Sequence, residues 1–91
     1  MDYLWDSNKA TANSAKHGID FADAVAVFED ELALWQEDGR EYGEDRFVVV
    51  GTDFLGQIIT IVFTFRGDTI RLISARKATK YERATYQRRR R

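Results

Sequence analysis

The chain has 91 residues, of which 44% are hydrophobic, and a formal net charge of −1. A chain of this length forms a single domain with a small core. It contains no cysteine and one histidine, which excludes a disulfide framework, thiolate chemistry and a Cys/His zinc site. No apolar run reaches the roughly 18 residues of a membrane span, and the N-terminus lacks the pattern of a secretory signal. We therefore expect a soluble cytoplasmic protein without a membrane partner.

The small net charge conceals a division along the chain. Residues 1–45 carry 12 acidic and 3 basic residues, a balance of −9, whereas residues 46–91 carry 3 acidic and 11 basic residues, a balance of +8. Such a division predicts two kinds of partner, a polyanion for the basic part and a cationic surface for the acidic part. The alternative is that the two parts neutralise each other within the fold.

The N-terminal third predicts a short strand over 3–5 and two helices. Asp6 is a suitable N-cap for a helix that ends at Lys16 or His17, and Gly18 is the expected residue beyond its last turn. A second helix follows, because apolar residues recur there at i, i+3, i+4 and i+7. We expect it to begin at Asp20 and to bury one face made of Phe21, Ala24, Val25 and Phe28.

The rest of the chain predicts strands and one further helix. The stretch 32–35 is expected to be a strand and 36–45 a polar loop. Three segments rich in β-branched and aromatic residues then follow closely enough to form an antiparallel meander, at 46–53, 57–65 and 68–75. The middle strand is apolar enough to be covered on both faces, one of them by the first two helices.

A C-terminal helix is expected from Lys77 to about Gln87, before a run of four arginines. The predicted order is β-α-α-β-β-β-β-α, an α+β fold in which two N-terminal helices and a C-terminal helix accompany an antiparallel sheet. We expect one domain over 1–87 and a disordered basic tail over 88–91, since a run of arginines forms no core.

Basic residues gather at the predicted strand ends and in the last helix: Arg46, Arg66, Arg71, Arg76, Lys77, Lys80 and Arg83. Guanidinium groups bind phosphate bidentately and stabilise charge on a transferring phosphoryl group, so this composition suits a nucleic-acid binder or a metal-free nuclease. The alternative for each residue is a solvated or acid-paired surface charge. Arg71 lies in an apolar strand, so it needs either a partner such as Glu44 or a cleft.

Several other polar residues allow two interpretations. His17 is a candidate general acid or base, because histidine readily exchanges protons near neutral pH, but a cation also stabilises a helix C-terminus. Lys9, Asn13 and Lys16 or His17 form one polar stripe, which faces either solvent or a phosphate backbone. Tyr81 and Tyr86 either pack the last helix onto the sheet, which we favour, or stack on bases. The sequence Arg-Gly-Asp at 66–68 predicts a hairpin turn.

Four motifs in order, WDSNKATANSAKHG (5–18), FADAVAVFED (21–30), GEDRFVVVG (43–51) and IRLISARKATKYERATY (70–86), resemble the BrnT family of type II toxins, the partners of BrnA antitoxins. The most specific are W-D-x-x-K-x-x-x-N-x-x-K-H-G over 5–18 and I-S-A-R-x-A over 73–78. The segments Glu44-x-Arg46 and Glu82-Arg83-x-x-Tyr86 also match the family pattern. The resemblance covers almost the whole chain, from Trp5 to Tyr86. Leu72, where isoleucine is common in the family, is the one departure.

The resemblance implies a RelE-like ribonuclease that blocks translation by cutting RNA without a metal or cofactor. It also implies neutralisation by a BrnA-type antitoxin in a hetero-oligomer, with operator DNA bound only through the antitoxin. We hypothesise that Arg71 and Arg76 hold the scissile phosphate and that His17 or Lys16 assists proton transfer during attack by the RNA 2′-hydroxyl. The remaining expected RNA contacts are Arg46, Arg66, Ser74, Lys77 and Arg83, with Glu44 in support. The alternatives are a non-catalytic module that binds RNA or protein, and a structural adaptor.

Overall fold

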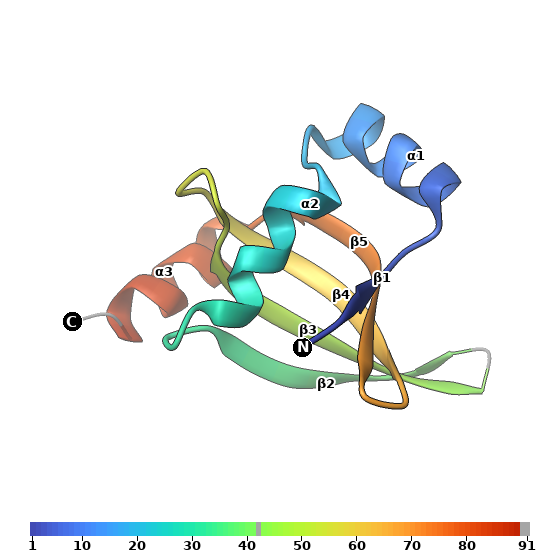
Figure 1. The fold of residues 1–91 in the computed structure, drawn as a ribbon. Coiled ribbons are helices and arrows are strands. Elements are labelled where there is room, and N and C mark those ends of the chain that lie inside the picture. The colour runs from blue at the N-terminus through green and yellow to red at the C-terminus, as the bar shows by residue number, and fades with distance from the viewer. Residues whose placement is uncertain (42, 90–91) are drawn as a thin grey trace.

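A computed structural model describes residues 1–41 and 43–89, and its ribbon is shown in Figure 1. The elements follow in the order β1 (Tyr3–Leu4), α1 (Ser7–His17), α2 (Phe21–Ala24), the 3₁₀ helix η1 (Val25–Glu29), β2 (Leu34–Glu41), β3 (Glu44–Thr52), β4 (Ile58–Arg66), β5 (Thr69–Lys77) and α3 (Lys80–Arg89). The expected α+β class is confirmed, whereas the element order differs in detail, because the 3₁₀ helix η1 follows α2. No helix within the described residues is long and apolar enough to span a membrane.

The sheet has the strand order β1-β5-β4-β3-β2. The pairs β2–β3, β3–β4 and β4–β5 are antiparallel, as the meander prediction required. The short strand β1 instead pairs in parallel with β5, so the sheet is mixed and the expectation of a purely antiparallel sheet is corrected. A hairpin would make two neighbouring strands antiparallel. Strands β1 and β5 are instead separated in the sequence by the helices α1 and α2 and by three strands, and this long connection allows them to run in the same direction.

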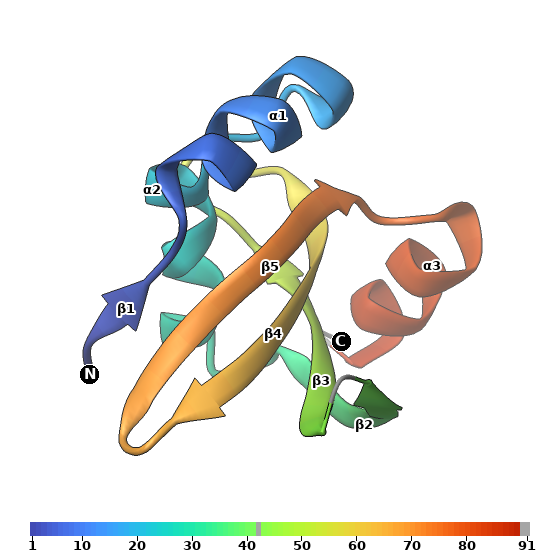
Figure 2. The ribbon, with the colours of Figure 1, turned by 90° about the vertical axis from the view of Figure 1, so that its right-hand side faces the viewer.

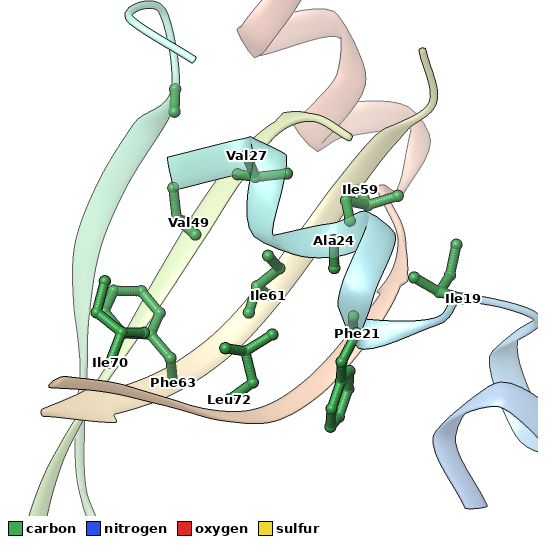
Figure 3. Packing of buried hydrophobic residues seen from close by; sticks show 12 residues of the cluster. Ile19, Phe21, Ala24, Val27, Val49, Ile59, Ile61, Phe63, Ile70 and Leu72 are labelled. Carbon is green, nitrogen blue, oxygen red and sulfur yellow. The ribbon is translucent and has the colours of Figure 1, made fainter. Parts of the chain in front are cut away.

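One face of the sheet packs against α2 and η1. Figure 3 shows Phe21, Ala24 and Val27 of this segment among the buried side chains of β3, β4 and β5. The predicted buried face is partly wrong: Phe21 and Ala24 are buried, but the third fully buried residue is Val27, while Val25 and Phe28 are only partly buried. The reason is that α2 ends after four residues and continues as a 3₁₀ helix. Three residues per turn bring positions 21, 24 and 27 onto one side.

Within the segment 36–45, expected to be a polar loop, residues 36–41 and 44–45 belong to strands of a hairpin, while residue 42 lies outside the described residues. β2 runs on to Glu41 and β3 already begins at Glu44. The strands continue there through charged cross-strand contacts, since Arg40 pairs with Asp45 at 2.9 Å. A register shift between Glu37 and Gly39, where Gly39 has φ 101°, bends the strand.

The helix α3 lies on the other face of the sheet from α2 (Figure 2). It begins at Lys80 and not at Lys77, because β5 continues to Lys77. Thr79 and Glu82 form a capping box in which Thr79 Oγ1 accepts from the Glu82 amide and Glu82 Oε1 accepts from the Thr79 amide.

The ends of α3 decide two further predictions. The packing role expected for Tyr86 is confirmed, since this side chain is buried, whereas Tyr81 is exposed. The helix extends to Arg89, so the expected disordered tail is wrong for Arg88 and Arg89. The last two arginines, 90–91, lie outside the described residues.

Candidate active site

Helix α1 presents its polar stripe toward the edge of β5. Its ends are as expected: Asp6 accepts a hydrogen bond from the Asn8 amide, and Gly18 closes the helix with φ 69°. In Figure 2, α1 lies at the top, towards the C-terminal end of β5. The short β1 covers β5 only at Ile70 and Arg71, which leaves the rest of that edge available to α1.

Asn13 joins α1 to that edge. Its carboxamide accepts from the Ala75 amide at 3.0 Å and donates to the Ala75 carbonyl at 2.9 Å, as a neighbouring strand would. The same amide nitrogen donates to the Ile19 carbonyl at 2.9 Å. Asn13 is buried, so these bonds are essential to satisfy groups that water cannot reach. They fix the position of α1 relative to the strand.

A cavity of about 230 Å³ opens between α1 and β5, and we call it the α1 pocket. It is lined by Lys9, Ala12, Asn13, Lys16, His17, Ile73 and Ser74. Three of the predicted site residues, Lys16, His17 and Ser74, therefore meet in one place. Two lysines and a histidine around a serine hydroxyl form a cationic pocket that suits a phosphate group and contains a side chain able to exchange a proton.

A β-bulge in β5 determines which residues reach this region. Val62 pairs with Ser74 and Phe63 pairs with Leu72, so Ile73 is an extra residue in β5. Without it, Ser74 and Arg76 would alternate onto the core face together with Leu72. The bulge turns both side chains to the opposite face, and it puts Arg71 and Arg76 on the same side of the sheet.

That side of the sheet carries four of the predicted arginines, and we call it the arginine face. The register places Arg71 beside Thr64 and Arg76 beside Thr60. Strand alternation from the core residues Phe47 and Phe63 adds two further arginines from β3 and β4. The arginine face is thus formed by Arg46, Arg66, Arg71 and Arg76, on the side opposite α2. Helix α3 covers its end near Arg76.

Three of these four arginines are held by glutamates. Arg66 binds Glu44 at 2.9 Å, and Arg46 binds Glu41 at 3.2 Å. Glu44, the partner considered for Arg71, therefore binds a different arginine. Arg71 is half-buried and makes no ion pair within residues 1–41 and 43–89.

Among the three arginine–glutamate pairs, Arg76 is held most firmly, by Glu82. Glu82 was not among the site residues predicted from the sequence. Arg76 Nη1 lies 2.8 Å from Glu82 Oε1, and Arg76 Nη2 lies 3.1 Å from Oε2, a bidentate pair. Thr60 Oγ1 also donates to Oε1 at 3.0 Å. The Arg76 guanidinium lowers the pKa of the Glu82 carboxyl to about 2, and the same contact raises the pKa of Arg76. The signal was present in the sequence as the capping-box pattern T-x-x-E at 79–82.

Two of the predicted RNA contacts belong neither to the α1 pocket nor to the arginine face. Lys77 pairs across from Ile59, a core residue, and so it lies on the other side of β5 from Arg76. Arg83 is exposed on α3. Within the described part of the chain, no group of three or more His, Cys, Asp or Glu side chains is arranged to hold a metal ion.

Comparison with known proteins agrees with the fold. The family model for "Ribonuclease toxin, BrnT, of type II toxin-antitoxin system" matches residues 5–82. A similar solved structure is the crystal structure of the Brucella abortus ribonuclease toxin BrnT, with 30% sequence identity, a TM-score of 0.67 and coverage of 88% of this chain and 99% of that chain. Comparison with curated proteins finds no match. Residues 5–82 include the whole α1 pocket and arginine face. The chain therefore belongs to the BrnT family of ribonuclease toxins of type II toxin–antitoxin systems, and an antitoxin partner follows from that membership.

Proposed function

We propose that this toxin is a metal-independent endoribonuclease of the cytoplasm that inhibits translation and is neutralised by a BrnA-type antitoxin. The observation that carries the proposal is the α1 pocket. Lys9, Lys16 and His17 line it together with Ser74, on the strand that also bears Arg71 and Arg76. Positive groups fixed around a phosphate stabilise the charge that develops in phosphoryl transfer, which is the contribution a metal ion makes in other nucleases.

The proposed reaction uses the RNA's own 2′-hydroxyl as the nucleophile. It attacks the adjacent phosphorus, the 5′-oxygen of the next nucleotide leaves, and a 2′,3′-cyclic phosphate remains. His17 or Lys16 transfers protons to or from these oxygens, which typically accelerates a reaction by about 10² to 10⁴. Ser74 orients the phosphate by a hydrogen bond, since no second histidine is present to activate it as a nucleophile.

The phosphate is held by Arg71 and Arg76 in this proposal. Arg71 is supported by its half-buried position without an acidic partner within the described residues, because such a guanidinium gains most from an arriving anion. Binding of a phosphate to Arg76 has a further requirement, because Arg76 already has a partner. An RNA phosphate must compete with Glu82 for its guanidinium, so contact with Arg76 requires this pair to open.

The test is cleavage of a defined RNA in EDTA by the purified toxin without antitoxin. We expect cyclic phosphate ends from the wild type, about 10²-fold or more slower cleavage by His17→Ala or Lys16→Ala if that residue moves the proton, and roughly ten- to a hundredfold slower cleavage by Arg71→Ala. Arg88→Ala, which removes an exposed arginine from α3, is the matched control and should cleave at the wild-type rate. Activity within a few-fold of wild type in all three site variants would refute the assignment. Intact RNA in every sample would move the same comparison onto translating ribosomes.

A non-catalytic RNA-binding toxin is the second candidate. The pairing of Arg46, Arg66 and Arg76 with glutamates favours it, because a guanidinium whose charge a carboxylate already balances stabilises less of the charge that develops during phosphoryl transfer. A double variant with Lys16→Ala and His17→Ala separates the two functions. A nuclease loses growth inhibition when both proton-transfer candidates are removed, whereas a binder keeps it.

A further inference from the structure

Six aromatic rings form one continuous cluster on the sheet face opposite the arginine face. Phe63 is fully buried at its centre, with ring centroids 5.1 Å from Phe28, 5.4 Å from Trp35, and 5.7 Å each from Phe47 and Phe65. Tyr3 completes the cluster beside Phe28, at 5.4 Å. We call these six residues the aromatic patch.

The aromatic patch is not covered by the rest of the fold. Trp35 is 48% exposed and Phe65 is 43% exposed. In Figure 1, α2 and its continuation lie over one part of this face, and the β2–β3 and β4–β5 hairpins extend past them. Solvent-exposed aromatic side chains grouped around a buried ring are typical of protein interfaces, where tryptophan and other aromatics supply much of the binding energy.

The surroundings of the aromatic patch are acidic. Glu37 lies directly across from Phe47 in the β2–β3 register. Glu29 directly follows Phe28 in η1, at the end of the patch where Tyr3 packs against Phe28. Burial raises the pKa of Tyr3, and the Glu29 carboxylate adds to the effect. Neither glutamate forms an ion pair within the described residues.

We propose that the antitoxin docks on the aromatic patch through a segment that places apolar side chains on Trp35 and Phe65 and Lys or Arg against Glu29 and Glu37. The proposal rests on the toxin function given above. Charge complementarity selects this occupant. RNA is repelled by the two carboxylates. A second copy of this chain, meeting the first through the same patch, would bring four unpaired carboxylates together.

This docking site separates recognition by the antitoxin from RNA cleavage. The aromatic patch lies on the opposite side of the sheet from Arg71 and Arg76, because core and arginine-face residues alternate along each strand. A toxin altered only in the aromatic patch therefore keeps its activity and escapes its antitoxin. Escape from neutralisation is a readout that damage to the fold does not produce.

The first test measures binding of the co-expressed antitoxin, after its separation from the toxin, to Trp35→Ala and Phe65→Ala. We expect each variant to bind about tenfold or more weakly than wild type. Phe54→Ala is the matched control, because Phe54 is 78% exposed in the β3–β4 turn, away from the patch, and its loss should change the affinity less than twofold. Equal affinities for wild type, Trp35→Ala and Phe65→Ala would overturn the proposal, as would equal weakening by Phe54→Ala.

A second variant avoids any loss of packing. Glu29 and Glu37 are exposed, so the double variant Glu29→Gln/Glu37→Gln retains the folded core. Its association rate with the antitoxin should fall about tenfold at low salt and approach the wild-type rate at high salt. An unchanged rate at low salt would overturn the charge argument.

RNA cleavage by the same variants keeps this test distinct from that of the proposed function. Trp35→Ala and Phe65→Ala toxins that cleave RNA at the wild-type rate but are no longer inhibited by the antitoxin support the docking site. Variants that bind the antitoxin as tightly as wild type refute it whether or not the toxin cleaves RNA. If neither the wild type nor the variants cut RNA, either free or on translating ribosomes, the proposed reaction fails while the binding measurement still decides the docking site.

Discussion

Replacement of Glu82 by glutamine removes the charge that holds Arg76 while keeping the shape of the side chain. The carboxylate of Glu82 accepts two hydrogen bonds from Arg76 and one each from Thr60 and the Thr79 amide. Lowering a carboxyl pKa from 4.5 to about 2 corresponds to about 3.4 kcal/mol at 1.36 kcal/mol per pH unit. The side chain of Arg76 is 37% exposed and that of Glu82 is 22% exposed, so solvent screens the pair. We therefore expect Glu82→Gln to lower the free energy of unfolding by about 1 to 2 kcal/mol at pH 7.

The pH dependence gives the sharper test. Because folding lowers the pKa of Glu82, its contribution is fully present above pH 4.5 and is lost as the pH falls toward 2. The difference in unfolding free energy between wild type and Glu82→Gln should therefore shrink across this window. Urea unfolding followed by circular dichroism at pH 7, 4.5, 3 and 2 measures it.

A matched variant controls for the loss of an ordinary surface ion pair. Asp45 pairs with Arg40 at 2.9 Å, and both side chains are largely exposed, so Asp45→Asn should change the unfolding free energy by no more than about 0.5 kcal/mol. If Glu82→Gln behaves like this control at pH 7, or if its deficit is as large at pH 2 as at pH 7, the stabilising role of the Arg76–Glu82 pair is refuted.

Three further predictions follow from single contacts. Asn13→Ala leaves buried backbone groups of β5 and of the α1–α2 connection without partners, so it should lower the free energy of unfolding, measured in urea, by about 2 to 4 kcal/mol. The exposed Asn8→Ala is the control and should lower it by no more than about 0.5 kcal/mol. Gly51→Ala places a methyl group 2.9 Å from a methyl group of η1 and should cost about 1 to 3 kcal/mol in the same measurement. Glu82→Gln releases Arg76, so binding of a non-cleavable RNA should tighten roughly tenfold if that guanidinium contacts phosphate, and unchanged affinity would exclude the contact.

Local signals in the sequence account for the correctly predicted elements. Asp6 and Gly18 delimit α1 because capping depends only on neighbouring residues. The three strands of the meander follow from runs of β-branched and aromatic residues joined by short turns. Four ordered motifs between residues 5 and 86 indicated the BrnT family, to which the chain belongs.

Boundaries that depend on pairing with distant residues were predicted wrongly. Polar composition favoured a loop over 36–45, but cross-strand ion pairs accompany strand pairing as far as Glu41 in β2 and from Glu44 in β3. Helix-forming composition favoured a helix from Lys77, but pairing with Ile59 keeps Lys77 in β5. In both places, contacts between strands outweigh the local preference of the residues.

The sequence alone determined the fold class, the family and the residue types available for the chemistry, because caps, strand runs and motifs act over a few neighbouring residues. Only the tertiary structure decided how the charges are distributed. Glu37 lies on the α2 side of the sheet, across from Phe47, whereas Arg71 and Arg76 lie on the opposite face, and a single bulge at Ile73 brings these two arginines to the same side. The tertiary structure also decided which arginines have a glutamate partner. Each such pair joins two secondary-structure elements, and composition does not reveal which elements are neighbours.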